Sequence, residues 1–326
     1  MIKTVVMEMN AQTTTILAAR VASITADGER VRVFELEALD GRALPPYDAG
    51  AHIDVHVAGL VRQYSLCGSG GQPGYQIAVL QTPDSRGGSM AMHALSVGEV
   101  LQISTPRNLF PLQPAEHTIL VAGGIGVTPI LAMAESLWRD RQSFELHYCA
   151  RSREAAAFLD RLSAAPWAAS VRTHFDDGPA GQGFDARAVL ATNAPNRHLY
   201  VCGPAGMIEA VLATARDLAW PSHALHWEAF APPSPPALEG GAFEVEIKSS
   251  GQVIVVGDEE TIVEALERQG VAIEVSCGQG ICGACLTRVL SGAPDHRDFI
   301  LTDEERSQFM TPCCSRALGG RLVLDL

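Results

Sequence analysis

The sequence lacks an apolar run long enough to cross a membrane. It also lacks a basic start followed by a short apolar core and a small-residue cleavage site. Basic residues are few, with 24 Lys and Arg against 37 Asp and Glu, so the formal net charge is −13. Binding to nucleic acid or to an anionic membrane requires a basic face, and the charge therefore argues against both partners. We expect a cytoplasmic protein of two or three domains.

Cysteine is the residue type with the clearest pattern. Cys277, Cys282 and Cys285 follow the C-x4-C-x2-C spacing of a plant-type [2Fe–2S] loop, and a fourth ligand is expected from Cys313, with Cys314 as the alternative. Glycines interleaved with these cysteines permit the φ > 0 turns that a backbone curled around a cluster requires. A zinc site or a disulfide framework is the competing interpretation. Zinc ribbons usually pair two short cysteine hooks, whereas the second hook is absent here.

The chain divides at a proline-rich spacer, residues 231–240, which is too stiff to join a helix or sheet interior. Before it, residues 12–113 alternate polar and apolar side chains in short segments, which predicts an all-β barrel. Residues 114–230 alternate apolar strands with helical stretches, which predicts an α/β domain with a mostly parallel sheet. Residues 241–326 read as strand, strand, helix, cysteine loop and final strand, typical of a small β-grasp ferredoxin. Thr261 and Glu264 are predicted to form the capping box that opens this helix. The chain is therefore predicted to be a multi-domain protein.

Two segments of the predicted barrel have the chemistry to hold a flavin. An arginine offers two-point binding to a phosphate, and a glycine pair before a short helix expected over 90–95 exposes backbone N–H groups to the same anion. A tyrosine can pack on the flavin ring, and a serine hydroxyl can donate to N5, the atom that receives hydride. Each segment alone is also compatible with an ordinary strand or turn. The candidate residues are Arg62, Tyr64, Ser65, Arg86, Gly87, Gly88 and Ser89.

Two segments of the predicted α/β domain suit a nicotinamide nucleotide. A buried strand runs into a glycine-rich turn and a helix that starts near Pro129, so the backbone can approach a pyrophosphate. The last strand of a predicted strand–helix series ends in a cysteine and a backbone bend, at the edge where α/β folds bind ligands. Alternatively, the turn is a bare connection and the cysteine is a core residue. The candidates are Gly123, Gly124, Gly126, Thr128, Cys202, Gly203 and Pro204.

Together the motifs resemble those of the phthalate dioxygenase reductase and vanillate demethylase reductase family, over nearly all of residues 13–326. The resemblance implies FMN in the barrel, NAD(P)H in the second domain, a [2Fe–2S] cluster in the third, an oxygenase as electron acceptor, and a monomer. It places Phe230 against the flavin ring, and it makes Ser65, Cys202 and Phe230 the catalytic candidates. An acidic residue at this position would favour NADH, but the chain has Arg151 there, which could hold the 2′-phosphate of NADPH. We nevertheless expect NADH, because the family favours it.

The predicted activity is that of the reductase component of a two-component Rieske-type oxygenase, which carries electrons from NADH through FMN and the cluster. The ferredoxin module is acidic, and residues 303–305 are a candidate docking surface for a basic patch on the oxygenase. A solvated face explains the same charges. Two other functions stay open: a general NAD(P)H diaphorase that serves another acceptor, and an iron–sulfur sensor or carrier that is not an enzyme.

Overall fold

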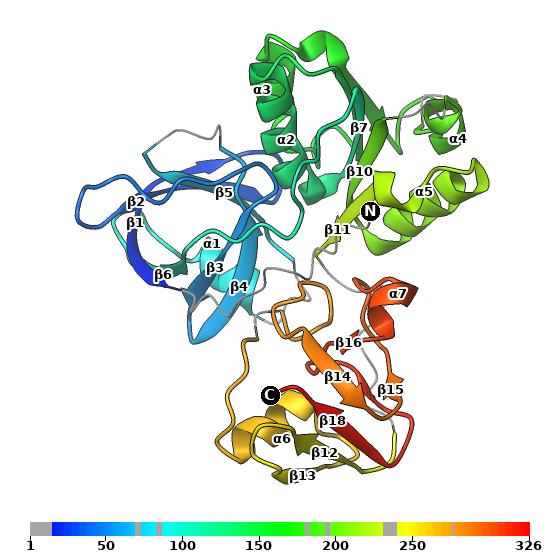
Figure 1. The fold of residues 1–326 in the computed structure, drawn as a ribbon. Coiled ribbons are helices and arrows are strands. Elements are labelled where there is room, and N and C mark those ends of the chain that lie inside the picture. The colour runs from blue at the N-terminus through cyan, green and yellow to red at the C-terminus, as the bar shows by residue number, and fades with distance from the viewer. Residues whose placement is uncertain are drawn as a thin grey trace.

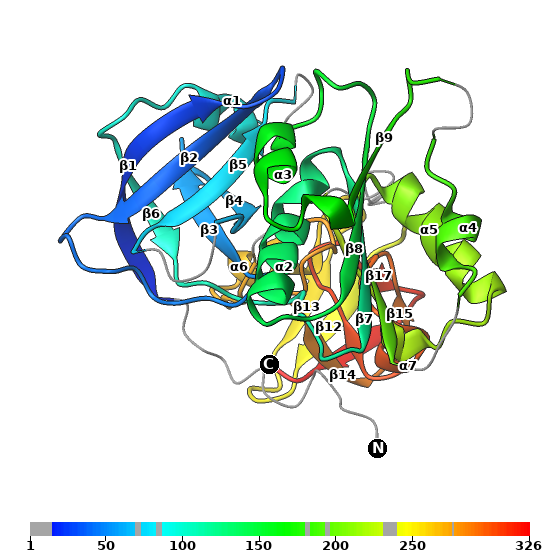
Figure 2. The ribbon, with the colours of Figure 1, turned by 90° about the horizontal axis from the view of Figure 1, so that it is seen from above.

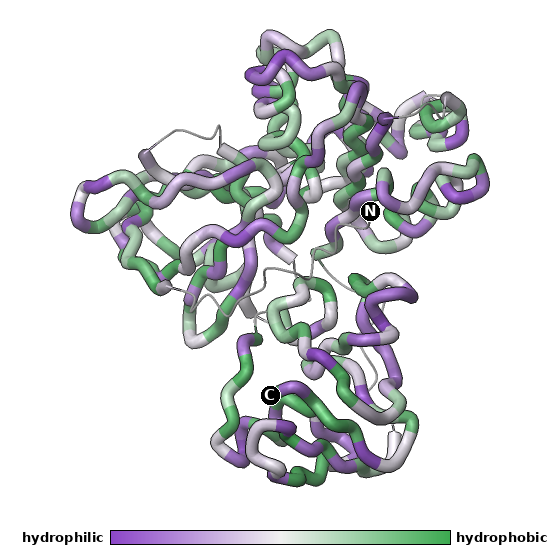
Figure 3. The backbone as a smooth tube through the Cα atoms, viewed as in Figure 1, coloured by the Kyte–Doolittle hydropathy of each residue, from purple (hydrophilic) through white to green (hydrophobic). Residues whose placement is uncertain are grey.

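The computed structural model describes residues 15–68, 73–82, 87–179, 183–192, 196–230, 240–275 and 277–326. The described residues form four sheets: one large sheet in each third of the chain and a small two-stranded sheet in the last third (Figures 1 and 2). Hydrophobic and hydrophilic stretches alternate along the backbone in all three parts (Figure 3). None of the described helices has the length and apolar character needed to cross a membrane.

The first sheet is six-stranded and antiparallel, in the order β4-β3-β6-β1-β2-β5. An isolated bridge between Leu66 and Ile77 joins the two edges, so the sheet closes as the predicted barrel. Alternation along the strands buries one side, including Phe34, Ile53 and Ile103, in a common core. The strands are β1 Ile16–Ala26, β2 Val31–Ala38, β3 His52–Val57, β4 Leu60–Ser65, β5 Tyr75–Leu80 and β6 Val100–Ser104, with helix α1 at Gly88–His93.

The second sheet is five-stranded and parallel, in the order β11-β10-β7-β8-β9. The order reverses between β7 and β10, so a crevice for ligands is expected at their carboxyl ends. Its strands are β7 His117–Gly123, β8 Phe144–Ala150, β9 Val171–Phe175, β10 Arg197–Gly203 and β11 Leu225–Ala229. The α-helices are α2 Val127–Arg139, α3 Leu159–Ala164, α4 Ala186–Leu190 and α5 Ala205–Asp217, and the 3-10 turns are η2 Gly124–Gly126, η3 Ala168–Ser170 and η4 Ser222–Ala224.

The third sheet, in the order β13-β12-β18-β14-β16, pairs β12 in parallel with the final strand β18 and packs on α6, as in a β-grasp. The predicted capping box at Thr261 and Glu264 opens α6, with both reciprocal hydrogen bonds present. The strands of this sheet are β12 Phe243–Ile247, β13 Val253–Val256, β14 Thr287–Ser291, β16 Phe309–Met310 and β18 Arg321–Leu324, while β15 Pro294–Asp295 and β17 Arg316–Ala317 pair as a separate two-stranded sheet. The helices are α6 Ile262–Arg268 and α7 Asp303–Arg306.

Candidate functional site

Arg62 and the glycine pair that opens α1 lie against each other, although they come from different elements. An ideal Cβ on Gly88 would lie 2.5 Å from Arg62 Nε, so any larger residue would displace the arginine. Gly87, the N-cap, has φ 86°, a left-handed conformation that favours glycine. Ser89 accepts a hydrogen bond from the Thr82 amide at 3.2 Å. Guanidinium and backbone amides therefore converge where a flavin phosphate is expected, while Arg86 falls outside the described residues.

Tyr64 and Ser65 end strand β4, next to the nucleotide-binding sheet. Burial raises the pKa of Tyr64 to about 12, so its phenol stays neutral beside a bound ring. Ser65 is buried, and its hydroxyl donates to Glu228 Oε2 at 3.4 Å. Glu228 was not predicted from the sequence. The signal that could have found it is a carboxylate in the last strand of the α/β domain, two positions before Phe230.

Glu228 lies on β11 beside Cys202 on β10, because the two residues face each other in the parallel register. Burial raises the pKa of Glu228 to about 8, and the Ser65 hydroxyl only partly offsets this. Burial, and then the Glu228 carboxylate, raise the pKa of the Cys202 thiol well above its ordinary value. The site therefore holds a carboxyl group that can carry a proton near neutral pH and a thiol that remains neutral.

Three glycines pack backbone against backbone at the crevice between β7 and β10. An ideal Cβ on Gly126 would lie 2.3 Å from the Cys202 carbonyl oxygen, and one on Gly203 would lie 2.9 Å from Gly123 Cα. A Cβ on Gly123 would lie 2.8 Å from Pro204 Cδ. These contacts keep the turn close to the strand end, so that a dinucleotide could approach the backbone.

The turn that follows β7 differs in detail from the prediction. Residues 124–126 form η2, and α2 begins at Val127, before Pro129. Gly124 has φ 53° and open space around it. The Thr128 hydroxyl donates to the Ile125 carbonyl at 3.0 Å, so this side chain orders the turn itself.

Phe230 and Arg151 both follow the carboxyl ends of strands of this sheet. Phe230, directly after β11, is 39% exposed. Arg151, directly after β8, is exposed, and its carbonyl accepts from the Asp177 amide at 3.2 Å. That contact brings the exposed Asp176–Asp177 pair after β9 to the same edge as Arg151, which the sequence analysis did not anticipate.

The cysteine loop has the conformation that its glycines predict. Gly278, Gly280 and Gly283 have φ values of 64°, 70° and 72°. An ideal Cβ on Gly280 would lie 2.4 Å from Cys314 Sγ, and the Gln279 amide donates to Cys277 Sγ at 3.3 Å. Backbone amides directed at sulfur are the contacts that iron–sulfur thiolates require.

The four predicted ligands contact one another through their thiols. Hydrogen bonds with Cys282 and Cys313 lower the pKa of Cys277, and Cys313 also contacts Cys285. In the described part of the chain, no three His, Cys, Asp or Glu side chains are arranged to hold a single metal ion. The cysteine spacing and these pairwise contacts indicate a two-iron cluster. The Cys314 thiol also hydrogen-bonds with Cys313, but its other partners are Thr311, whose Oγ1 lies 3.1 Å from Cys314 Sγ, and Ser315.

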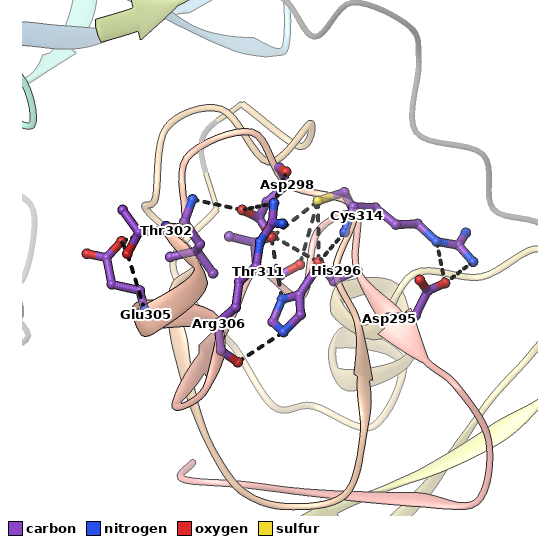
Figure 4. Close-up of polar contacts among 11 residues, drawn as sticks. Asp295, His296, Asp298, Thr302, Glu305, Arg306, Thr311 and Cys314 are labelled. Atoms are coloured by element: carbon purple, nitrogen blue, oxygen red, sulfur yellow. Dashed lines mark hydrogen bonds and ion pairs between the residues drawn. The ribbon is translucent and has the colours of Figure 1, made fainter. Parts of the chain in front are cut away.

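A polar network supports the loop from behind (Figure 4). Asp298 is buried, and its Oδ2 accepts from the Leu301 amide at 2.9 Å, while Arg306 donates to the Asp298 carbonyl at 3.0 Å. His296 approaches the Arg306 carbonyl at 3.1 Å. The Phe299 amide donates to the Gly280 carbonyl at 3.0 Å, which ties this network to the loop. Residues 296–299 therefore brace the cysteine loop.

Comparisons with known proteins agree with this arrangement. Residues 120–213 match the model of the oxidoreductase NAD-binding domain, and residues 245–318 match that of the 2Fe-2S iron-sulfur cluster binding domain. A vanillate O-demethylase oxidoreductase from Pseudomonas sp. (strain HR199 / DSM 7063) is 53% identical over 294 residues, which cover 88% of this chain and 92% of that protein.

Two solved structures align over 95% of this chain. Phthalate dioxygenase reductase, described as modular for electron transfer from pyridine nucleotides to [2Fe-2S], is 38% identical, with a TM-score of 0.74 and 98% of its chain covered. An intact type IV self-sufficient cytochrome P450 monooxygenase is 37% identical, with a TM-score of 0.84 and 41% of its chain covered. The chain thus belongs to the phthalate dioxygenase reductase and vanillate O-demethylase oxidoreductase family, and it is an NAD(P)H-dependent flavin iron–sulfur oxidoreductase.

Proposed function

We propose that this chain is the reductase component of a Rieske-type oxygenase that demethylates a small aromatic substrate, with NADH as the electron source. One observation carries the proposal: the three candidate sites adjoin one another in the order that electron transfer needs. The flavin site meets the nicotinamide site where Ser65 bonds Glu228. The cysteine loop lies next to the barrel at Gly283 and Leu109. An ideal Cβ on Gly283 would lie 4.0 Å from Leu109 Cδ1.

The residues of the flavin site have distinct parts in this proposal. Arg62, Gly87 and Gly88 bind the phosphate of FMN, and Tyr64 packs on its ring. With Glu228 protonated, its carboxyl can donate to Ser65 Oγ, which would leave the Ser65 hydroxyl hydrogen available to donate to flavin N5 when FMN is bound. Glu228 therefore sets the direction of the Ser65 hydrogen bond through its own protonation.

The remaining residues bind NADH and iron. Gly123, Gly126 and Gly203 admit the pyrophosphate, Cys202 lines the nicotinamide pocket, and Phe230 covers the flavin ring until nicotinamide displaces it. Cys277, Cys282, Cys285 and Cys313 ligate the iron. When bound, FMN accepts a hydride from NADH, and the cluster passes electrons on one at a time.

The 53% identity to a vanillate O-demethylase oxidoreductase over most of both chains supports this partner class. We expect a monomer in the cytoplasm, and we expect α7, with Asp303, Glu304 and Glu305, to face the oxygenase. The alignment with a self-sufficient cytochrome P450 supports a second candidate, in which a haem protein is the acceptor.

The test combines the purified chain with NADH, oxygen, the aromatic methyl ether and either a vanillate-type oxygenase or a P450. The proposal predicts about one formaldehyde and one demethylated product per NADH with the Rieske oxygenase only. Turnover with the P450 alone would favour the second candidate, and NADH consumption without either product would indicate a general diaphorase.

A further inference from the structure

The described residues contain an ion pair between the flavin barrel and the ferredoxin module, and the proposed function assigns it no role. Arg107 follows β6 in the barrel, and its Nη1 donates to Glu274 Oε1 at 2.7 Å. Glu274 lies between α6 and the cysteine loop, three positions before Cys277. The two residues are 167 positions apart in the chain, so the contact exists only when the ferredoxin module lies against the barrel.

Arg107 is fixed on the barrel side of this contact. Its backbone pairs with His52 in both directions, at 2.9 and 3.0 Å. Its Nη2 donates to Asp54 Oδ2 at 2.8 Å, and the Asp54 side chain is only 9% exposed. Each end of the guanidinium therefore has its own carboxylate, and the end that faces Glu274 needs little reorganisation to bind it.

The same barrel segment contacts the cysteine loop a second time. Leu109, two residues after Arg107, lies beside Gly283, between Cys282 and Cys285. Segment 107–109 therefore contacts both the cysteine loop and the residues immediately before it. Together these two contacts orient the loop on the barrel. Figure 1 shows the loop next to the barrel, apart from the outer strands of the ferredoxin module.

The two carboxylates differ in a way that makes this contact reversible. Asp54 is buried, whereas the Glu274 side chain is 45% exposed. An exposed ion pair is weak and is screened by salt, while a buried one is screened much less. Salt is thus expected to release Glu274 before it releases Asp54, so that Arg107 remains in place while the ferredoxin module leaves.

We propose that Arg107 is a positioning residue which docks the cysteine loop on the barrel through Glu274, and that this contact opens and closes during electron delivery. The docked form aligns the loop for the internal step, in which one electron leaves the reduced flavin and one ferric iron becomes ferrous. The open form frees the loop for the external acceptor. The inference rests on the proposed function, because it assumes that electrons pass from the barrel to the loop.

Glu274→Gln is the cleanest variant, because Glu274 is half-exposed, whereas loss of Arg107 would leave Asp54 buried without its partner. Glu274→Lys adds repulsion toward Arg107. Glu267→Gln, an exposed position on α6, removes the same charge elsewhere in the module and serves as the control. Each protein is studied with flavin and cluster bound, at low and at high salt.

Two readouts test the proposal. In anaerobic stopped-flow experiments at low salt, Glu274→Gln should slow cluster reduction at least threefold and Glu274→Lys more, with flavin reduction by NADH within twofold of wild type. High salt should slow wild type and Glu267→Gln to the level of Glu274→Gln. Small-angle scattering should show expansion of the two Glu274 variants at low salt, and of wild type only at high salt.

An unchanged rate of cluster reduction, or unchanged scattering, in both Glu274 variants would overturn the proposal. Slower flavin reduction in these variants would also overturn it, because the contact would then support the barrel site rather than position the loop. If wild type reduced its flavin but never its cluster, the proposed function would fail instead, whatever the scattering showed.

Discussion

The hydroxyl of Ser65 and the carboxylate of Glu228 lie 3.4 Å apart, although 163 positions separate them in the chain. Ser65 ends strand β4 of the barrel, and Glu228 lies on β11, the edge strand of the parallel sheet. The contact joins the two sites that must exchange a hydride. The Glu228 carboxylate is partly buried, and this burial affects both the stability of the fold and the chemistry of the site.

Glu228→Gln should stabilise the apoprotein increasingly as pH rises. The pKa of Glu228 is raised from 4.5 to about 8 by burial, so between these values the folded state binds a proton that the unfolded state has lost. Folding stability contributed by this group is therefore complete below about pH 4.5 and falls as pH rises through 8. We expect the variant to gain about 2 kcal/mol at pH 8.5 relative to pH 4.5, since one pKa unit is worth about 1.4 kcal/mol and Glu228 is only half-buried.

Denaturant unfolding at both pH values measures this difference. Glu209→Gln, at an exposed position on α5, is the matched control and should show no such trend. A Glu228→Gln gain that is equal at the two pH values would contradict a raised pKa.

Cys313→Ser should prevent assembly of the cluster, and Cys314→Ser should not. The Cys313 thiol hydrogen-bonds with Cys277 and Cys285 as well as with Cys314, whereas the partners of the Cys314 thiol are Cys313, Thr311 and Ser315. Iron content and visible absorbance of the purified proteins report the outcome. A complete cluster in Cys313→Ser, with loss in Cys314→Ser, would reverse the ligand assignment.

Gly126→Ala should weaken NADH binding at least tenfold and destabilise the fold by about 2–3 kcal/mol. The new Cβ would lie 2.3 Å from the Cys202 carbonyl oxygen, and two backbones would have to separate. Gly206→Ala is the control, because nothing lies within 4 Å of its ideal Cβ. Equal nucleotide affinity in the two variants would show that close packing at this turn is unnecessary.

NADH should be preferred over NADPH in kcat/KM. The Asp177 amide donates to the Arg151 carbonyl, so the Asp176–Asp177 pair lies at the edge where the adenosine ribose is expected. Carboxylates there favour a free 2′-hydroxyl over a phosphate. Arg151 would be the dominant determinant if NADPH proved the better substrate, and Arg151→Ala would then remove that preference.

Local patterns of the sequence were sufficient for much of the fold and of the cluster site. The capping box at Thr261 and the left-handed glycines of the cysteine loop are set by neighbouring residues, and both predictions are confirmed. Glu228 and Arg107 were missed for the opposite reason. Their partners, Ser65 and Glu274, lie 163 and 167 positions away, and only the packed sheets bring them together.

The ends of short elements were also hard to predict from the sequence. The helix after β7 was expected near Pro129, but the 3-10 turn at residues 124–126 lets it begin at Val127. The helix expected over 90–95 runs instead from Gly88 to His93, because the left-handed Gly87 supplies its N-cap. The first residue of each of these two helices is therefore set by turn geometry rather than by hydrophobic periodicity.

The central claim is that electrons pass from NADH to the flavin and then to the cluster within this one chain. Anaerobic stopped-flow absorbance after mixing with NADH, before any acceptor is added, tests it most directly. We predict rapid bleaching of the flavin followed by loss of cluster absorbance in the same protein, and no cluster bleaching in Cys313→Ser. Flavin bleaching with an unchanged cluster in wild type, or cluster bleaching that precedes the flavin, would contradict the account.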